Sequence, residues 1–457
     1  MSRAYIFVTG LFFVGICSFN SHASDEDLSI RLGTFVVDAS PPIGSPLAYN
    51  PCKAIGMPLT ARGIVLKGAG EPIVLCAVDW IGISNGGYDE WRETIAKAVK
   101  TTPERVAVHT LHQHDAPVCD FSAAELLNEA GYAGTMFDVA FARRTIANVA
   151  DAAKQALDDA TVVTHVGLGE AAVEKVASNR RILGEDGKVR VVRYTSTTDP
   201  AVRAEPEGVI DPLVKSISFW NVDEPLVVLT YYATHPQSYY QTGVANPDFP
   251  GMARFLRETT HNGLTHVHFN GAGGNIGAGK YNDGAHENRQ VLAIRLAEGM
   301  AKAYQATEKY PVTADDLDWT VLPVSLPVAK HLDENELMAQ LKDSKDIRAA
   351  LRNEIAKDLV WLRRSRRGHT VDLTCLRLGP ARILHMPGEL AVEYQLAAQK
   401  MRSDQFVAMA AYGEYAPGYI CLKEHYAQGG YEDSPGASKV APEVEEVLMP
   451  AMRELLK

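Results

Sequence analysis

Three histidines with metal-binding potential, His109, His112 and His114, lie within six residues of one another. They follow residues 105–108, whose apolar side chains predict a buried strand. Neutral imidazole is the commonest metal-binding side chain, and ligand sites in α/β proteins gather at strand ends. Because residues two apart on an extended chain point to the same side, His112 and His114 can reach one small volume. The alternative is a polar loop whose histidines hydrogen-bond to the backbone.

Four later segments repeat this arrangement of an apolar run followed by polar or glycine-rich residues. His235 and Glu389 stand in two of them. Taken alone, a histidine in such a place is a metal ligand about as often as a structural cap. Several such segments together predict a site built from separate strand ends. The four segments are Thr234-His235-Pro236, residues 270–279, Met386-Pro387-Gly388-Glu389 and residues 412–431.

The glycine-rich segment 270–279 contains a phosphate-loop spacing that is not a phosphate loop. Gly274, Gly279 and Lys280 match G-x-x-x-x-G-K, but Tyr281 replaces the Ser or Thr that would hold magnesium. Nucleotide binding is therefore disfavoured. Because glycine permits close approach, we expect this loop to bring backbone N–H groups to a ligand.

Apolar runs and amphipathic stretches alternate along the chain, which predicts an α/β fold of mixed β-sheets flanked by helices. No Pro/Ser-rich linker divides the sequence, so residues 24–457 are expected to form a single large catalytic domain. Helices are expected at residues 88–99, 139–157, 287–306 and 442–455, with a charged helical stretch over 333–367. Strands are expected at residues 63–66, 73–78, 106–108, 162–166, 216–220, 226–232, 266–269, 382–384 and 406–411.

Residues 1–23 have the features of a secretory signal peptide. Arg3 precedes a largely apolar stretch, and a small-x-small cleavage site ends at Ala23. We therefore expect an exported protein, either periplasmic or secreted. Cys17 raises a lipoprotein alternative, although Ile16 before it is atypical of a lipobox. The cleaved, soluble form is the preferred interpretation.

Charge and cysteine spacing exclude two classes of function. The formal net charge of −11 makes the chain a poor candidate for nucleic-acid binding. The cysteines that follow the predicted signal show no CxxC spacing, so a cysteine zinc site is not expected. One disulfide is compatible with export, and the sequence does not assign its pairing. These cysteines are Cys52, Cys76, Cys119, Cys375 and Cys421.

Six segments, in order along the chain, resemble the motifs of the neutral (alkaline, non-lysosomal) ceramidase family. Each segment is weak evidence alone, but six of them in the family's order form a specific signal. Together they cover nearly all of the chain after residue 23. The resemblance is to the family's catalytic domain only. The segments are His112-Gln113-His114-Asp115-Ala116-Pro117, Ser178-Asn179-Arg180-Arg181, Thr234-His235-Pro236, Asn270 to Ala278, Met386-Pro387-Gly388-Glu389, and Gly418-Tyr419 with Gly430-Tyr431-Glu432.

The resemblance implies a bound Zn²⁺ ion. Two neutral imidazoles, a carboxylate and a phenol oxygen form a donor set that suits zinc, and a weakly held phenol leaves room for water. The zinc ligands that the resemblance implies are His112, His235, Glu389 and Tyr419. The catalytic residues that it implies are His114, Arg180 and Tyr431.

The resemblance further implies hydrolysis of the amide bond of an N-acyl substrate such as ceramide. His114 and Arg180 would stabilise the developing oxyanion, and Tyr431 would add a hydrogen-bonding group. Asp115 or Asp248 could move the proton, and the sequence does not choose between them. The implied partner is an N-acyl lipid or another acylated small molecule, with peripheral membrane contact left open and no protein partner expected.

Departures from the family motifs keep other functions open. Asn275-Ile276-Gly277 stands where the family has D-V-S, and Asp115-Ala116 replaces Ser-Gly after the H-x-H motif. One alternative is an exported zinc amidase or esterase that acts on acylated sugars or N-acyl amino acids. Another is a two-metal hydrolase, although the H-x-H-x-D-H pattern lacks its last histidine here. A third is a catalytically inactive exported binding protein.

Overall fold

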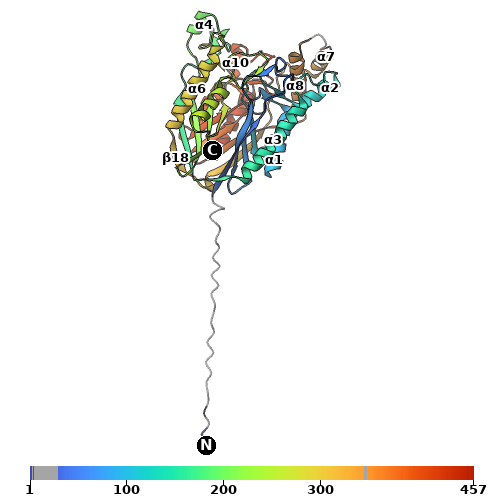
Figure 1. Cartoon of the computed structure of the whole chain (residues 1–457). Coiled ribbons are helices and arrows are strands. Elements are labelled where there is room, and N and C mark those ends of the chain that lie inside the picture. Colours follow the sequence, from blue (N-terminus) through green and yellow to red (C-terminus); the bar gives the residue numbers. More distant parts are fainter. Residues whose placement is uncertain (3, 5–28, 344–346) are drawn as a thin grey trace.

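Three mixed β-sheets form the framework of the computed structural model, which describes residues 1–2, 4, 29–343 and 347–457 (Figure 1). Nearly all of the predicted signal peptide, residues 1–23, lies outside the described residues. Within the described part of the chain, no helix is long and apolar enough to cross a membrane. The predicted α/β architecture of mixed sheets flanked by helices is confirmed.

Each sheet is named here by the order of its hydrogen-bonded strands. The first has the order β6-β4-β3-β1-β8, from β1 (Ile30–Asp38), β3 (Thr60–Lys67), β4 (Ile73–Val78), β6 (Val106–Thr110) and β8 (Thr161–Val163). The second has the order β16-β14-β13-β9-β18, from β9 (His165–Ala172), β13 (Leu213–Asn221), β14 (Glu224–Tyr232), β16 (His266–Asn270) and β18 (Glu308–Pro311). The third has the order β19-β20-β21-β23, from β19 (Leu317–Val324), β20 (Val371–Leu378), β21 (Ala381–His385) and β23 (Phe406–Ala410).

Each of the three sheets ends in one parallel pair, while its other pairs are antiparallel. The parallel pairs are β4 with β6, β14 with β16, and β21 with β23. The edge strand β16 contacts both β6 and β23, so the three parallel pairs lie next to one another. Because parallel strands end on the same side of a sheet, this arrangement gathers several strand ends in one place.

The sheets share an apolar core to which all three contribute. Leu75 of β4, Leu229 of β14 and Ile383 of β21 are each 0% exposed and belong to one buried cluster. Burial of such side chains is the main favourable contribution to folding. This shared core fixes the three sheets relative to one another, and therefore fixes the positions of their strand ends.

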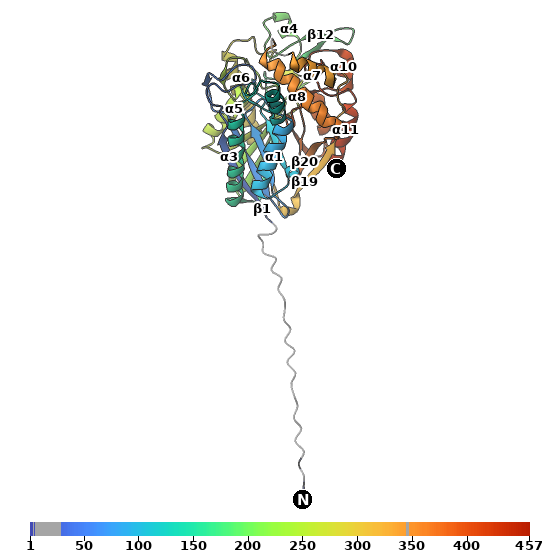
Figure 2. The same cartoon turned by 90° about the vertical axis from the view of Figure 1, so that its right-hand side faces the viewer.

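Helices cover the outer faces of the sheets. Helix α3 packs on β1 and β3 and against α1, and α6 packs on β9 and β13 and against α5 (Figures 1 and 2). Near the carboxyl terminus, α9 packs on β23, and α11 packs on β19 and β20. The helices are α1 (Asn85–Val99), α2 (Phe121–Glu129), α3 (Val139–Asp158), α4 (Pro200–Ala204), α5 (Asp248–Thr260), α6 (Glu287–Gln305), α7 (Glu334–Lys342), α8 (Ala349–Arg366), α9 (Val392–Met401), α10 (Lys423–Gln428) and α11 (Val444–Leu455).

Helix α3 illustrates why the sequence forms these elements. Its N-cap residue Asp138 accepts a 2.9 Å hydrogen bond from the Phe141 N–H, which satisfies one of the unpaired amides of the first turn. Phe141, Ile146, Val149 and Ala153 recur at helical spacing and are buried. One face of the helix therefore covers the first sheet, while the other faces solvent.

Two expected elements differ from the structure. The stretch 162–166 is divided between β8 and β9, which belong to different sheets. The charged stretch 333–367 forms two helices, α7 and α8, with residues 344–346 between them outside the described part. The five cysteines of the described chain are buried and form no disulfide.

Candidate metal site

Hydrogen bonds between the ends of β6, β16 and β23 hold the site together. The Thr110 N–H donates to the Tyr412 carbonyl at 2.9 Å, and the Ala411 N–H donates to the Asn270 carbonyl at 2.9 Å. The Asn270 side-chain amide in turn donates to the Leu111 carbonyl at 2.5 Å. The segments that follow the three edge strands are thus joined directly after each strand ends. His112 lies immediately beyond this junction.

His112 is held in one orientation by its own backbone. Its φ of 64° lies in the left-handed region, which a non-glycine residue rarely adopts and which is common at functional sites. Its N–H donates to the Trp80 carbonyl at 2.9 Å, and its Nδ1 lies 2.6 Å from the Ile81 carbonyl. Since a carbonyl only accepts, Nδ1 carries the proton and Nε2 is left with a free lone pair. This is the arrangement that metal-binding histidines use.

His235 and Glu389 bring two more ligand atoms to the same point. His235 follows β14, and Glu389 begins the two-residue strand β22 (Glu389–Leu390), which pairs with β24 (Tyr419–Ile420). Oε2 of Glu389 lies 3.3 Å from Nε2 of His112 and 3.4 Å from Nδ1 of His235. All three side chains are at most 2% exposed.

These three ligand atoms fit a metal ion. Nε2 of His112, Nδ1 of His235 and Oε2 of Glu389 are buried, and none has a hydrogen-bond partner. Leaving a buried polar atom unpaired costs about 1–3 kcal/mol. Three such atoms in one place therefore indicate a binding site for a cation that all three can contact. Two atoms that each lie about 2.0–2.1 Å from a tetrahedral zinc ion are about 3.3 Å apart, which matches the observed separations.

The electrostatic surroundings keep these groups in the protonation state that a metal requires. Burial, and then the nearby charge of Arg180, lower the pKa of His235 well below its ordinary value. Burial acts to raise the pKa of Glu389, but His112 and a hydrogen bond from Tyr415 outweigh it, so the pKa of Glu389 is lowered. A neutral imidazole beside an ionised carboxylate is the form that binds a metal cation.

His114 lies beside the two other histidines and nearer the surface. Its Nε2 is 2.9 Å from Nε2 of His235, and its Nδ1 is 3.0 Å from both the Tyr49 hydroxyl and Nε2 of Gln237. His112, His114 and His235 each offer a nitrogen, all within 4.8 Å of one another, so this group could also hold a metal. His114 is thus either a third histidine ligand of the metal or the hydrogen-bond partner of His235.

Arg180 and Tyr419 form a pair behind the three ligand atoms. Nη1 of Arg180 donates to the Tyr419 hydroxyl at 3.0 Å and to the Gly274 carbonyl at 3.2 Å. Arg180 is 3% exposed. Burial raises the pKa of Tyr419 well above its ordinary value, and the charge of Arg180 opposes this rise. The Tyr419 ring stacks near His235, with the ring centroids 6.4 Å apart.

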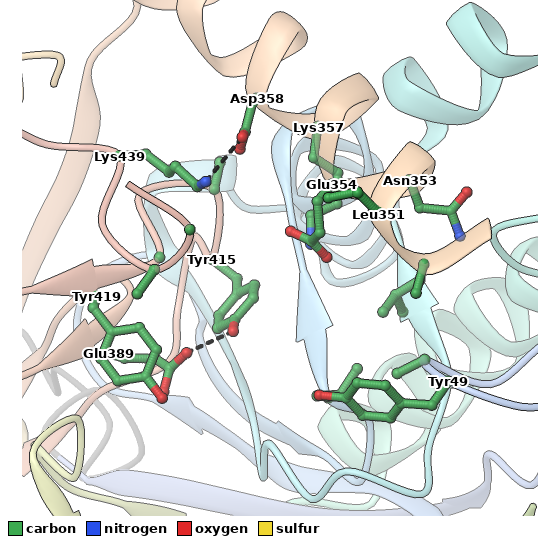
Figure 3. A pocket seen from close by; sticks show the side chains of 18 of the residues that line it. Tyr49, Leu351, Asn353, Glu354, Lys357, Asp358, Glu389, Tyr415, Tyr419 and Lys439 are labelled. Carbon is green, nitrogen blue, oxygen red and sulfur yellow. Dashed lines mark hydrogen bonds and ion pairs between the residues drawn. The ribbon is translucent and has the colours of Figure 1, made fainter. Parts of the chain in front are cut away.

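A cavity of about 290 Å³ opens beside these residues (Figure 3). His112, His114, Glu389, Tyr419 and Tyr431 lie on its inner side. Tyr431 is 39% exposed, and its ring centroid is 5.5 Å from that of Tyr419. The opposite side is formed by the first turns of α8 and by residues near 436–439.

The structure thus brings together all seven residues singled out from the sequence, and their individual roles stay predictions. Arg180 differs from expectation in its position: its guanidinium lies behind Tyr419 and is not part of the cavity lining. It therefore contacts the site through the Tyr419 hydroxyl. The seven residues are His112, His114, Arg180, His235, Glu389, Tyr419 and Tyr431.

The two aspartates considered for proton transfer lie elsewhere. Asp115 accepts hydrogen bonds from the N–H and the hydroxyl of Thr242, at 3.0 and 2.7 Å. Asp248 pairs with Arg289 at 3.2 Å and accepts from the Ser238 N–H. Neither lines the cavity. Both carboxylates hold loops in place and do not face the site.

The glycine-rich loop also differs from expectation. It lies behind the ligands, and its glycines are not part of the cavity lining. A Cβ on Gly273 would come within 2.5 Å of the Thr234 carbonyl oxygen, and a Cβ on Gly274 within 2.3 Å of the Glu389 carbonyl oxygen. The Gly274 N–H donates to the Leu390 carbonyl at 2.8 Å. The loop therefore packs the segments that carry His235 and Glu389 closely together.

Two tyrosines of the site were not singled out from the sequence. Tyr415 donates a 2.6 Å hydrogen bond from its hydroxyl to Oε1 of Glu389 (Figure 3). Tyr49, on a loop after β1, reaches His114. Tyr415 belongs to the tyrosine-rich segment 412–431, which was a usable signal, whereas no motif surrounds Tyr49.

Comparison with known proteins supports the fold. No protein-family model matches the sequence, and no curated protein matches it. The structure is similar to that of a ceramidase complexed with C2, with a TM-score of 0.69 and 16% identity over 94% of this chain and 75% of that chain. It is also similar to neutral ceramidase from Pseudomonas aeruginosa, with a TM-score of 0.66 and 16% identity over 94% of this chain and 74% of that chain. The similarity to neutral ceramidases inferred from the motifs is thus confirmed at the level of the fold.

Proposed function

We propose that the protein is a zinc-dependent hydrolase that cleaves the amide bond of an N-acyl substrate. The observation that carries the proposal is the convergence of three buried atoms without hydrogen-bond partners, on His112, His235 and Glu389. The likeness in fold to neutral ceramidases supports the same reaction class. Two imidazole nitrogens and a carboxylate, with the Tyr419 phenol close by, form a donor set typical of zinc.

The proposed reaction assigns different tasks to the residues around the metal. Zinc, when bound, lowers the pKa of water and polarises a carbonyl group. His114 and Tyr431 lie on the cavity side, where they can hydrogen-bond the substrate carbonyl. Arg180 fixes the Tyr419 hydroxyl from behind. Water adds to the carbonyl carbon, the C–N bond breaks and the leaving nitrogen takes up a proton, so the products are a carboxylic acid and an amine.

Metal analysis combined with an activity panel tests this proposal. Purified protein should contain about one zinc ion per chain and should hydrolyse at least one of a set of chromogenic N-acyl amides, esters and acetylated sugars. A chelator should abolish the activity and added zinc should restore it. Zinc-loaded protein that turns over none of the panel would favour a binding protein, and cleavage of esters or acetylated sugars alone would favour an esterase.

We also propose that the protein is exported and that cleavage removes residues 1–23. The support is the arrangement of a basic residue, an apolar stretch and small residues before position 24. Amino-terminal sequencing of the protein from its native host should begin at Ser24. A lipid-modified Cys17 would support the lipoprotein alternative instead.

A further inference from the structure

The side of the cavity that faces the candidate metal site carries several charged groups beside apolar ones such as Leu351. Helix α8 contributes Glu354, Lys357 and Asp358 to this side, and Lys439 approaches from the carboxyl-terminal segment (Figure 3). A lipid-binding pocket is ordinarily lined by hydrophobic and aromatic side chains with few polar groups. This wall is therefore unusual for a site that would take an alkyl chain.

The charges are organised into two ion pairs. Nζ of Lys357 lies 2.7 Å from Oε1 of Glu354, and Nζ of Lys439 lies 2.8 Å from Oδ2 of Asp358. The side chains of Lys357, Lys439 and Asp358 are 8–12% exposed. An alkyl chain laid against this wall would remove the remaining water from these charges and offer no hydrogen bond in return, which is unfavourable.

Glu354 is the member of these pairs that the cavity can reach. Its side chain is 49% exposed, and its carboxylate points into the cavity from α8 (Figure 3). One of its oxygens is held by Lys357, so the carboxylate still has acceptor positions for a bound molecule. The Tyr49 and Tyr415 rings flank the same space from the other side. The most exposed member of the two ion pairs is thus a hydrogen-bond acceptor that faces the cavity.

We propose that the substrate is a small N-acyl compound with a polar, hydrogen-bond-donating group that binds the Glu354 carboxylate while the amide lies at the metal site. The donor is a hydroxyl or an ammonium group, and long-chain lipids are poor substrates. A cavity of about 290 Å³ is near the lower end of the range for small-molecule sites. This inference rests on the proposed amide hydrolysis and names the class of substrate for it.

Amides with the same four-carbon chain test the inference. N-butylacetamide, N-acetylaminobutanol and N-acetylputrescine differ only in whether the fourth carbon of that chain carries a hydrogen, a hydroxyl or an ammonium group. The zinc-loaded wild type should show a kcat/KM about 10- to 100-fold higher for at least one polar amide than for N-butylacetamide, the range expected for one hydrogen bond to a charged group. A second set with the end group on the acyl side covers the opposite orientation.

Two variants of the exposed Glu354 complete the test. Glu354→Leu should reduce the preference to nearly onefold, because the polar amides lose their hydrogen-bond acceptor. Glu354→Gln keeps an acceptor but not the charge, so it should retain the hydroxyl preference and lose the ammonium preference. The inference is overturned if the preference is unchanged in Glu354→Leu, or if the wild type prefers N-butylacetamide or a long-chain ceramide.

A binding measurement separates this inference from the proposed reaction. If zinc-loaded protein hydrolyses none of the amides, the reaction is wrong, and titration calorimetry with the same three amides then decides the inference. Binding of a polar amide that Glu354→Leu weakens about tenfold or more supports the polar pocket. Equal binding of all three amides, or none, overturns it.

Discussion

The Tyr415 hydroxyl lies 2.6 Å from Oε1 of Glu389, and this hydrogen bond fixes which carboxylate oxygen faces the two histidines. Because Oε1 is engaged, Oε2 is the oxygen near His112 and His235. A ligand carboxylate is often held in this way by a neighbouring donor, which narrows the orientations it samples before the metal binds. The relationship leads directly to the first prediction.

Tyr415→Phe should weaken metal binding without unfolding the protein. The change removes only the hydroxyl that holds Glu389, and loss of such a supporting hydrogen bond typically costs about 10–100-fold in metal affinity. Competition with a zinc chelator measures the affinity. Tyr310→Phe is the matched control, since it removes a tyrosine hydrogen bond to Glu308 on the exposed strand β18. Equal affinity in both variants would show that Tyr415 does not position Glu389.

His235→Ala should lose bound zinc. The change removes one of three converging ligand atoms and leaves a metal site with two. Elemental analysis of the purified variant should give far less than one zinc per chain, whereas His165→Ala, on the partly exposed start of β9, should retain the wild-type content. Full zinc content in His235→Ala would contradict the assigned ligand set.

His114→Ala should lower turnover while most of the metal stays bound. Nε2 of His114 lies 2.9 Å from Nε2 of His235, but His114 contributes none of the three converging atoms that lack a hydrogen-bond partner. Loss of one hydrogen-bond donor to the transition state typically lowers kcat by about 10²–10³-fold. Measuring kcat and zinc content in the same sample checks both parts. Complete loss of zinc would instead identify His114 as a ligand, as the grouping of the three histidines allows.

Much of the candidate site could be predicted from the sequence because the proposed ligands stand directly after apolar runs. His112, His235 and Glu389 each follow a stretch that forms a strand of a different sheet, and motif order linked them. What the sequence does not contain is the direction of a side chain. Arg180 was expected to face the substrate carbonyl, yet its guanidinium lies behind Tyr419 and is not part of the cavity lining.

Features that depend on packing between distant segments were missed for a related reason. Tyr415 resembles its neighbours Tyr412 and Tyr419 in sequence, and only the fold shows that it reaches Glu389. The charged stretch 333–367 gives no sign in the sequence that Lys357 of α8 is nearly buried against the cavity. Likewise, the apolar residues at 162–166 give no sign that the chain changes sheets near Thr164.

Glu414→Gln should stabilise the protein increasingly as the pH rises from 5 to 8. Oε1 of Glu414 accepts from the N–H groups of Asn85 and Ala416, Oε2 is buried without a partner, and burial raises the pKa of Glu414 to about 8. A glutamate in the unfolded chain has a pKa of about 4.3. Between these values the folded state holds a proton that the unfolded state lacks, so wild-type stability falls as the pH rises through this window.

The glutamine variant has no such proton, and its amide oxygen can accept the same two hydrogen bonds. Its advantage over the wild type in the free energy of unfolding should therefore grow by more than about 1.4 kcal/mol, the equivalent of one pKa unit, between pH 5 and pH 8. Denaturant unfolding at both pH values measures it. The exposed Glu129→Gln serves as the control. A difference that does not change with pH would show that Glu414 is ionised in the folded protein.

Gly274→Ala should disrupt the metal site, because the glycine loop packs directly against a ligand segment. The added Cβ would stand 2.3 Å from the carbonyl oxygen of Glu389, and backbone cannot yield as a flexible side chain can. Glu389 would be displaced from His112 and His235, so zinc affinity should fall sharply. Gly436→Ala is the matched control: Gly436 also lines the cavity, but a Cβ there meets nothing within 4 Å.

The thermal stability of the metal-free proteins separates a local from a global effect of Gly274→Ala. If the variant folds with a melting temperature close to that of metal-free wild type but binds zinc much more weakly, the loop acts by setting the distance between ligand segments. If zinc affinity stays at the wild-type level, the close approach of Gly274 to Glu389 has no bearing on metal binding. In that case the glycine at position 274 would serve the packing of the loop alone.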